Sequence, residues 1–455
     1  MRGAFRHLRY PILLAIWLVP RHMGVMTIRA KPPRPPRRPA LPLGTATRRA
    51  ALRLLDAVLR RGEALEAALP AATRDLVSPP DRGLAHAIAA ETLRRLPDLD
   101  ALIDSATRQI LPEDAKARMA LRIALAQALA LGTPPHAAIA TVLPLVDGGP
   151  RRLVHGVFGT LMRGGAALPE TPTLLVPVAE RWREAWGEEV VAAASRAIAA
   201  PPPLDVTLRD PAWSGLEGES LAPGHVRLVD AGPVPELPGY DAGAWWVQDL
   251  AASLPARLIG SGAGQALDLC AAPGGKTLQL AAAGWQVTAV DASKSRAARL
   301  NENLARTGLS ADVVVGDVLD WAPDAPAEAV LVDAPCSATG IFRRHPDVLH
   351  RAHDGVIAEM AELQGRILAR AADWVRPGGL LVYATCSLEP AEGEAQLAQF
   401  LGQRGDFAVM PPAPGELPAG IAAHPDGYVR TLPGTVEATG GCDGFFVARL
   451  RRASA

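Results

Sequence analysis

Residues 267–277 read LDLCAAPGGKT, an apolar run that passes through a glycine pair into residues typical of a helix. The run predicts a buried strand, and Gly274 and Gly275 allow the tight turn that leads from a strand into a helix. Further apolar runs alternate with helical stretches along the C-terminal half: QVTAV, DVVVG, AVLVD and LLVYAT. This alternation predicts an α/β fold with a mainly parallel, twisted sheet covered by helices. Right-handed crossovers then place the carboxyl ends of the strands at one edge.

Carboxylates follow the predicted strands at this edge. Asp291 ends the second strand, 23 residues after Asp268, while Asp317 follows VVVG and Asp333 follows AVLV. Open parallel sheets bind ligands beyond the carboxyl ends of their strands, and an acidic residue after the second strand can accept both hydroxyls of a ribose. A lone Asp at a strand end often only caps a helix or faces solvent. Because several stand in register, we expect a nucleoside site.

The sequence GGKT at 274–277 also resembles the end of a phosphate-binding P-loop, so an ATPase is the alternative. Cys270 stands where a P-loop needs its first glycine. Pro273 removes a backbone N–H from the loop that would bind the phosphate oxygens. Both residues argue against a polyphosphate ligand and favour a nucleoside cofactor such as S-adenosylmethionine.

Two of the four cysteines follow consecutive strands, Cys336 after DAP and Cys386 after YAT. A single cysteine is often only a small buried hydrophobe, but two at equivalent strand ends weaken that interpretation. The cysteines form no Cys-x-x-Cys zinc pattern and no dense disulfide framework, so we expect a reducing cytoplasm and no permanent disulfide. The histidines have no matching set of carboxylates, and we expect no metal.

The chain divides into four expected regions. Residues 1–46 hold an apolar stretch and the tract KPPRPPRRP, which predicts a disordered leader or basic tail. Apolar residues three and four apart predict an all-helical domain at 47–165, interrupted by breaks such as Pro79-Pro80 and Pro134-Pro135. A linking subdomain is expected at 166–236, with a strand at 204–209, and the α/β domain at 237–453. The formal net charge of zero excludes a wholly basic coat protein.

These motifs, together with others in the same order, resemble the NOP/Sun family of RNA (cytosine-5) methyltransferases, most closely its bacterial ribosomal RNA branch. The resemblance rests on Trp246–Asp249, LDLCAAPGGKT, the DAPCSATGIFRRHPD run at 333–347, YATCS at 383–387 and DGFFVARL at 443–450. The helical region is similar to a NusB domain, with Asp81-Arg82 opening one helix and RRLVHGVFGTLMR closing the domain. Gly159 and Gly393 stand where this family usually has asparagine. The resemblance implies a Rossmann-like methyltransferase domain preceded by an all-α NusB-like domain.

The resemblance implies that Cys386 is the nucleophile and that Cys336 assists product release. DNA-methylating relatives use the cysteine of the Pro-Cys motif, so the reverse assignment is the alternative. A thiolate is needed because cytosine C5 is too poor a nucleophile until sulfur has added at C6. Nearby positive charge lowers the pKa of such a thiol, and Lys276 is the candidate. Asp333 is expected between cofactor and base, where it can accept from the exocyclic amine of cytosine.

The implied cofactor is S-adenosylmethionine, and the implied substrate is RNA, in particular small-subunit ribosomal RNA. Arg343, Arg344 and His345 are expected to contact the RNA. We expect a monomer that binds neither metal nor membrane. A NusB-like RNA-binding protein with an inert catalytic half is a further alternative. The residues expected to bind the cofactor are Cys270, Ala271, Ala272, Pro273, Gly274, Gly275, Lys276, Asp291, Asp317 and Asp333.

Overall fold

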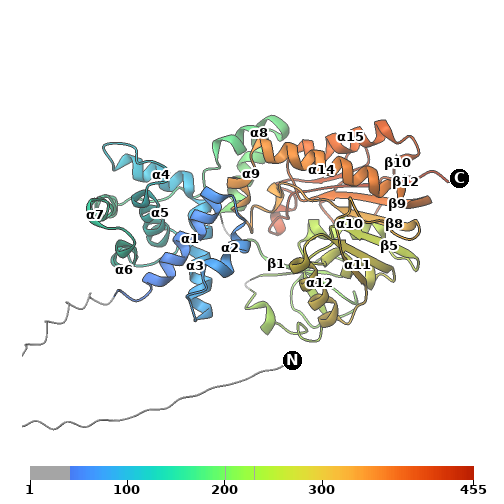
Figure 1. The fold of residues 1–455 in the computed structure, drawn as a ribbon, viewed down its shortest axis with the longest axis horizontal. Helices are drawn as coiled ribbons and strands as arrows, with labels where there is room; N and C mark the ends of the chain where they lie inside the picture. The colour runs from blue at the N-terminus through green and yellow to red at the C-terminus, as the bar shows by residue number, and fades with distance from the viewer. Residues whose placement is uncertain (1–40, 200, 230, 455) are drawn as a thin grey trace, which may run out of the picture. The chain divides into compact units, whose positions relative to one another are not determined.

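The apolar runs of the C-terminal half pair into one eight-stranded sheet in the computed structural model, which describes residues 41–199, 201–229 and 231–454 (Figure 1). The strands are β5 (Gln265–Leu269), β6 (Gln286–Asp291), β7 (Asp312–Val315), β8 (Ala327–Asp333), β9 (Val375–Thr385), β10 (Phe407–Val409), β11 (Val429–Thr431) and β12 (Phe445–Arg452). Strands β9, β8, β5, β6 and β7 lie side by side in this order and run parallel. Strand β12 runs antiparallel beside β9, and β10 and β11 pair with β12. The mainly parallel sheet predicted from sequence is confirmed.

Helices cover both faces of this sheet because each strand presents alternate side chains to opposite faces. Val330 and Val332 of β8 pack into one hydrophobic core, whereas Ala329 and Leu331 pack into another. The first face is covered by α14 (Asp354–Asp373) and α15 (Glu394–Gln403) (Figure 1). The second is covered by α10 (Leu250–Ile259), α11 (Gly275–Ala282) and α12 (Lys294–Thr307). Functional groups of the sheet can therefore reach a ligand only at its edge.

The N-terminal half is helical, as its periodicity predicts. Its helices are α1 (Thr45–Arg61), α2 (Leu65–Ala72), α3 (Pro79–Arg94), α4 (Leu96–Ser105), α5 (Lys116–Leu129), α6 (Pro135–Val142) and α7 (Gly148–Arg163), and they share one hydrophobic core. Pro79 and Pro135 are the first residues of their helices, where a missing N–H costs nothing, so two predicted breaks mark helix starts. Helix α2 contains Pro70, although proline is unfavourable inside a helix.

A small antiparallel sheet follows helices α8 (Val176–Trp186) and α9 (Glu188–Ile198) in the chain. Its strands lie in the order β2-β3-β1-β4. They are β1 (Leu204–Leu208), β2 (Glu219–Ala222), β3 (His225–Leu228) and β4 (Trp245–Val247). The strand predicted at 204–209 is β1. The sheet takes its last strand from beyond residue 236, where we expected the linking subdomain to end.

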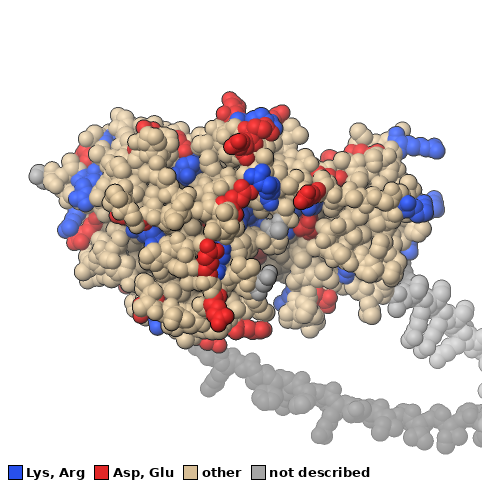
Figure 2. All heavy atoms as spheres, turned by 180° about the vertical axis from the view of Figure 1, so that it is seen from behind, with Lys and Arg blue, Asp and Glu red and all other residues tan. Residues whose placement is uncertain are grey.

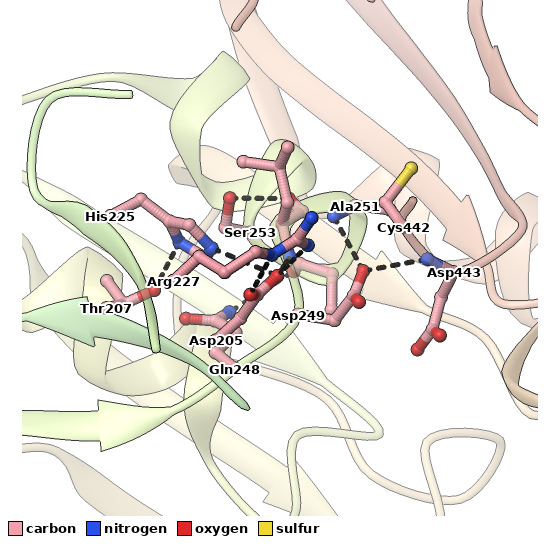
Figure 3. A network of polar contacts seen from close by, with 12 residues as sticks. Asp205, Thr207, His225, Arg227, Gln248, Asp249, Ala251, Ser253, Cys442 and Asp443 are labelled. Carbon is pink, nitrogen blue, oxygen red and sulfur yellow. Dashed lines mark hydrogen bonds and ion pairs between the residues drawn. The ribbon is translucent and has the colours of Figure 1, made fainter. Parts of the chain in front are cut away.

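A buried network of charges joins this small sheet to the α/β part of the chain (Figure 3). Arg227 on β3 donates two hydrogen bonds to Asp205 on β1, at 2.6 and 2.7 Å. The backbone amide of Leu250, at the start of α10, donates to Asp205 as well, at 3.2 Å. Asp249 caps the same helix and accepts from the amide of Asp443 at 3.0 Å. These contacts hold the small sheet, the start of α10 and the loop before β12 together.

The predicted leader lies mainly in residues 1–40, which are outside the described residues. In the part of the chain that the structure describes, no helix is both long enough and apolar enough to cross a membrane. On the face shown in Figure 2, Lys and Arg side chains are interspersed with Asp and Glu, in keeping with the net charge of zero.

Candidate active site

The residues that follow the parallel strands meet at one edge of the sheet. Two hydrogen bonds link residues that are far apart in the chain: the amide of Ala272 donates to Asp291 at 3.0 Å, and the ammonium of Lys276 donates to Asp333 at 2.7 Å. Cys270, directly after β5, has a left-handed backbone with φ 61°, so the loop turns sharply as it leaves the sheet. The loop after β5 is thus fastened to the ends of both β6 and β8.

Cys336 and Cys386 form a thiol pair at this edge. Their sulfur atoms are 3.5 Å apart, both side chains are partly exposed, and neither is in a disulfide. The hydrogen bond to Cys386 and burial raise the pKa of the Cys336 thiol well above its ordinary value. Either sulfur can donate the hydrogen bond between them, and the raised pKa marks Cys336 as a thiol that ionises less readily than usual.

Lys276 links the loop after β5 to Asp333 and lies near the thiol pair. Burial lowers the pKa of Lys276, but Asp333 outweighs burial and the net shift is upward, so the side chain is a cation. The charge of Cys386 also contributes to this upward shift. The ammonium lies 5.1 Å from the centre of the Phe445 ring. Because Lys276 is bound to Asp333, it is not free to reach a phosphate, which removes the main support for the ATPase alternative.

Asp268 is a buried carboxylate near the carboxyl end of β5 and belongs to the same site. It accepts from Thr277 at 2.5 Å, and its Oδ1 is buried without a hydrogen-bond partner among the described residues. Burial, with contributions from Asp333 and Asp291, raises the pKa of Asp268 to about 7. Burial and the same carboxylates raise the pKa of Cys270 to about 12. Asp333 is paired with Lys276 and Asp291 with Arg296, so Asp268 is the carboxylate of this site that is suited to a cationic ligand.

Two predicted cofactor ligands differ in their surroundings. Asp291 is 2% exposed, and its two oxygens already accept from the amides of Ala272 and Ser293. Asp317 is exposed and accepts from the amide of Leu319 at 2.8 Å, as a turn residue does. A contact of either carboxylate with the cofactor stays a prediction.

Arg343 lies mostly below the surface, and an RNA contact of this residue stays a prediction. Arg343 is 5% exposed and donates to the carbonyl of Gly440 at 2.5 Å, so packing removes it from the surface. Arg344 is bound to two carboxylates, Asp249 at 3.0 Å and Asp443. His345 is partly exposed, and burial lowers its pKa. An RNA contact of Arg344 or His345 stays a prediction.

The comparisons with known proteins agree with this geometry. The family described as "16S rRNA methyltransferase RsmB/F" matches residues 261–451, and the NusB family matches residues 45–151. The chain is 34% identical to ribosomal RNA small subunit methyltransferase B of Klebsiella pneumoniae, over 88% of this chain and 96% of the relative. It is 36% identical to the protein of the same name from Xylella fastidiosa, over 90% and 98%. The chain belongs to the RsmB/F family of rRNA methyltransferases.

The likeness extends to solved structures. The crystal structure of PH0851 has a TM-score of 0.69 at 21% identity and covers 90% of this chain and 99% of its own, which shows a shared fold. The cofactor of the RsmB/F family is S-adenosylmethionine. That molecule carries a sulfonium and an ammonium group, and the unpartnered Oδ1 of Asp268 fits a cation of this kind. Among the described residues, no group of His, Cys, Asp and Glu is arranged to hold a metal ion.

Proposed function

We propose that this chain transfers a methyl group from S-adenosylmethionine to C5 of a cytosine in small-subunit ribosomal RNA, with Cys386 as the nucleophile. The observation that carries the proposal is the pair of sulfur atoms 3.5 Å apart at the ligand-binding edge of the sheet. Family membership supports methyl transfer to rRNA, and the thiol pair supports cytosine C5 as the acceptor. An intact, closely spaced pair does not support the alternative of an inert catalytic half.

Cofactor binding is assigned to the loop that follows β5 and to the carboxylates around it. S-adenosylmethionine supplies a methyl group on a positively charged sulfur atom. Asp268 and Asp333 are proposed to provide negative charge near it, and Asp291 is proposed to accept from ribose hydroxyls. Residues 270–276 are proposed to enclose the methionine and ribose portion, and Asp317 to lie beside the adenine.

The two cysteines divide the reaction between them. The sulfur of Cys386 adds to C6, which moves electron density to C5, and C5 then takes the methyl group. A solvent base removes the C5 proton, the C5–C6 double bond forms again, and the bond between C6 and the sulfur of Cys386 breaks. The thiol of Cys336 donates a hydrogen bond to the leaving sulfur, so that the thiolate departs more easily. The reaction requires an unpaired or flipped-out cytosine, because an RNA duplex hides its base edges.

Specificity for cytosine is assigned to Asp333. Its Oδ2 is held by Lys276, and its side chain remains 29% exposed. An ionised carboxylate accepts hydrogen bonds only, so it can bind the exocyclic amine of cytosine, whereas uracil presents a carbonyl at that position.

Two variants test the proposal. Cys386→Ala is expected to lower the rate of methyl transfer by about 10⁴-fold or more and to form no covalent adduct with RNA. Cys336→Ala is expected to accumulate a covalent protein–RNA adduct because release of Cys386 is slowed. Both outcomes are read from denaturing gels with ribosomal RNA, and bisulfite sequencing of rRNA from a deletion strain locates the product. An adduct formed by Cys386→Ala, but not by Cys336→Ala, would reverse the roles.

A further inference from the structure

A single buried carboxylate, Glu392, connects the two cysteine motifs. Ser337 follows Cys336 and Ser387 follows Cys386, and both hydroxyls donate to the same oxygen, Oε2 of Glu392. The other oxygen, Oε1, accepts from the backbone amide of Ser337 at 2.8 Å. Glu392 is 0% exposed. The chain segments that carry the two sulfur atoms are therefore tied to one side chain.

Glu392 is itself held in place by neutral groups. Gln364 donates to Oε1 at 3.1 Å, and the hydroxyls of Tyr383 and Thr385 donate to the backbone carbonyl of Glu392 at 2.8 and 3.2 Å. Gln364 also donates to the carbonyl of Pro335, in the Pro-Cys motif, at 2.9 Å. No Lys, Arg or His of the described residues forms a salt bridge with Glu392. Hydrogen bonds from neutral groups therefore stabilise its negative charge.

The two sulfur atoms differ in the charged side chains that act on them. Glu392 accepts from the amide next to Cys336, and its charge contributes to the raised pKa of that thiol. The cation Lys276 interacts with Cys386 instead. The negative charge of Glu392 favours the neutral thiol at Cys336, which leaves Cys386 as the candidate for the attacking sulfur.

We infer that Glu392 is a positioning residue that aligns the two thiols and, through its negative charge beside the Cys336 motif, leaves Cys386 as the sulfur free to attack. The inference rests on the proposed function for its consequence in catalysis. Its consequence for the thiols requires neither RNA nor cofactor. A test on the free protein therefore separates failure of this inference from failure of the proposed function.

The test measures how fast iodoacetamide alkylates each cysteine, by mass spectrometry of peptides from the full-length protein across a range of pH. In the wild type, Cys386 is expected to react faster than Cys336. Glu392→Gln keeps the shape of the side chain and removes its charge. It is expected to lower the ratio of the two alkylation rates by about tenfold, which corresponds to one pKa unit. Methyl transfer is expected to lose about 10²-fold in kcat, with the KM for S-adenosylmethionine unchanged.

A matched control is Glu389→Gln. Glu389 lies in the same loop and is 3% exposed, but its side chain binds Trp182 and Arg181 rather than the serines. This variant is expected to keep the wild-type alkylation ratio even where it lowers thermal stability. Ser387→Ala, a smaller change, serves if Glu392→Gln does not fold, and it is expected to shift the ratio in the same direction. The inference is overturned if the ratio of alkylation rates is unchanged in Glu392→Gln or, where that variant does not fold, in Ser387→Ala. It is also overturned if Glu389→Gln shifts the ratio by the same amount.

Discussion

Asp205 and Asp268 are both buried aspartates on β-strands, and their pKa values shift in opposite directions. Burial alone raises the pKa of each. At Asp205 the hydrogen bonds from Arg227 and the proximity of His225, whose Nε2 lies 3.6 Å away, outweigh burial and bring the pKa down to about 2. Among the described residues, Asp268 accepts only from the hydroxyl of Thr277 and has one unpartnered oxygen, and its pKa rises to about 7. A buried charge that is paired within the chain supports the fold, whereas one left unpaired is suited to an incoming ligand.

The largest effect is expected from breaking the paired site. Asp205→Asn leaves the guanidinium of Arg227 buried without its counter-ion, which costs about 3–5 kcal/mol of unfolding free energy. The loss is measured by urea denaturation. The matched control is Asp75→Asn, which removes a surface ion pair with Arg53 whose side chains are 40% and 60% exposed, and it is expected to change little. Equal losses in the two variants would show that burial of the pair does not matter.

A smaller effect of a different kind is expected at the unpaired site. Asp268→Asn removes a carboxylate whose ionised form is disfavoured by burial, so the protein is expected to be as stable as the wild type or more so. Affinity for S-adenosylmethionine is expected to fall by about 1–3 kcal/mol, because the cofactor loses a charged acceptor. Isothermal titration measures the affinity and thermal denaturation the stability. A variant that loses stability but keeps affinity would contradict the comparison.

The smallest expected effect is the release of a proton from Asp268 when the cofactor binds. The raised pKa of about 7 leaves Asp268 largely protonated at pH 6, and a bound cation favours the carboxylate. Cofactor binding at pH 6 is expected to release up to about one proton, and affinity is expected to rise as the pH increases through 7. Titrations in buffers of different ionisation enthalpy count the proton, and Asp268→Asn should abolish its release.

The two sites also predict opposite slopes of stability against pH. Asp268 binds more protons folded than unfolded between its ordinary value of 3.8 and about 7, so its contribution to stability falls as pH rises through this range. Asp205 has a lowered folded pKa, so its contribution is present above 3.8 and is lost as pH falls towards 2. Denaturation curves of the two Asn variants over these ranges separate the contributions, and each variant is expected to flatten only its own slope.

Predictions from sequence were reliable where they depended on one strand or one helix at a time. The strand ends that carry Asp291, Asp333 and Cys386 were placed at one edge because parallel connections leave no other arrangement. Sequence says less where a distant residue decides the surroundings of a side chain. Arg343 reads as a surface cation in its motif but is covered by the loop at Gly440, 97 residues later.

The glycine at position 393, where the family usually has asparagine, is also explained by residues that are distant in the chain. A Cβ at this position would lie 2.5 Å from the guanidinium of Arg430 and 2.8 Å from the ring of Phe446, so the larger asparagine usual in the family does not fit here. Arg430 in turn binds Glu394 and lies over the Phe446 ring. The neighbours that exclude a side chain come from strands β11 and β12, which the sequence around Gly393 does not reveal.

From the sequence alone one can predict the alternation of strands and helices, the edge at which the ligand groups gather and the two thiols of the site. These follow from hydrophobic periodicity, the handedness of crossovers and the motifs themselves, all of which are local properties of the chain. Only the tertiary structure decided that the sulfur atoms approach to 3.5 Å, that Asp268 has an unpartnered oxygen and that Glu392 ties both motifs together. Each of these depends on residues tens of positions apart being packed within hydrogen-bond distance, and that distance is set by the cores on the two faces of the sheet.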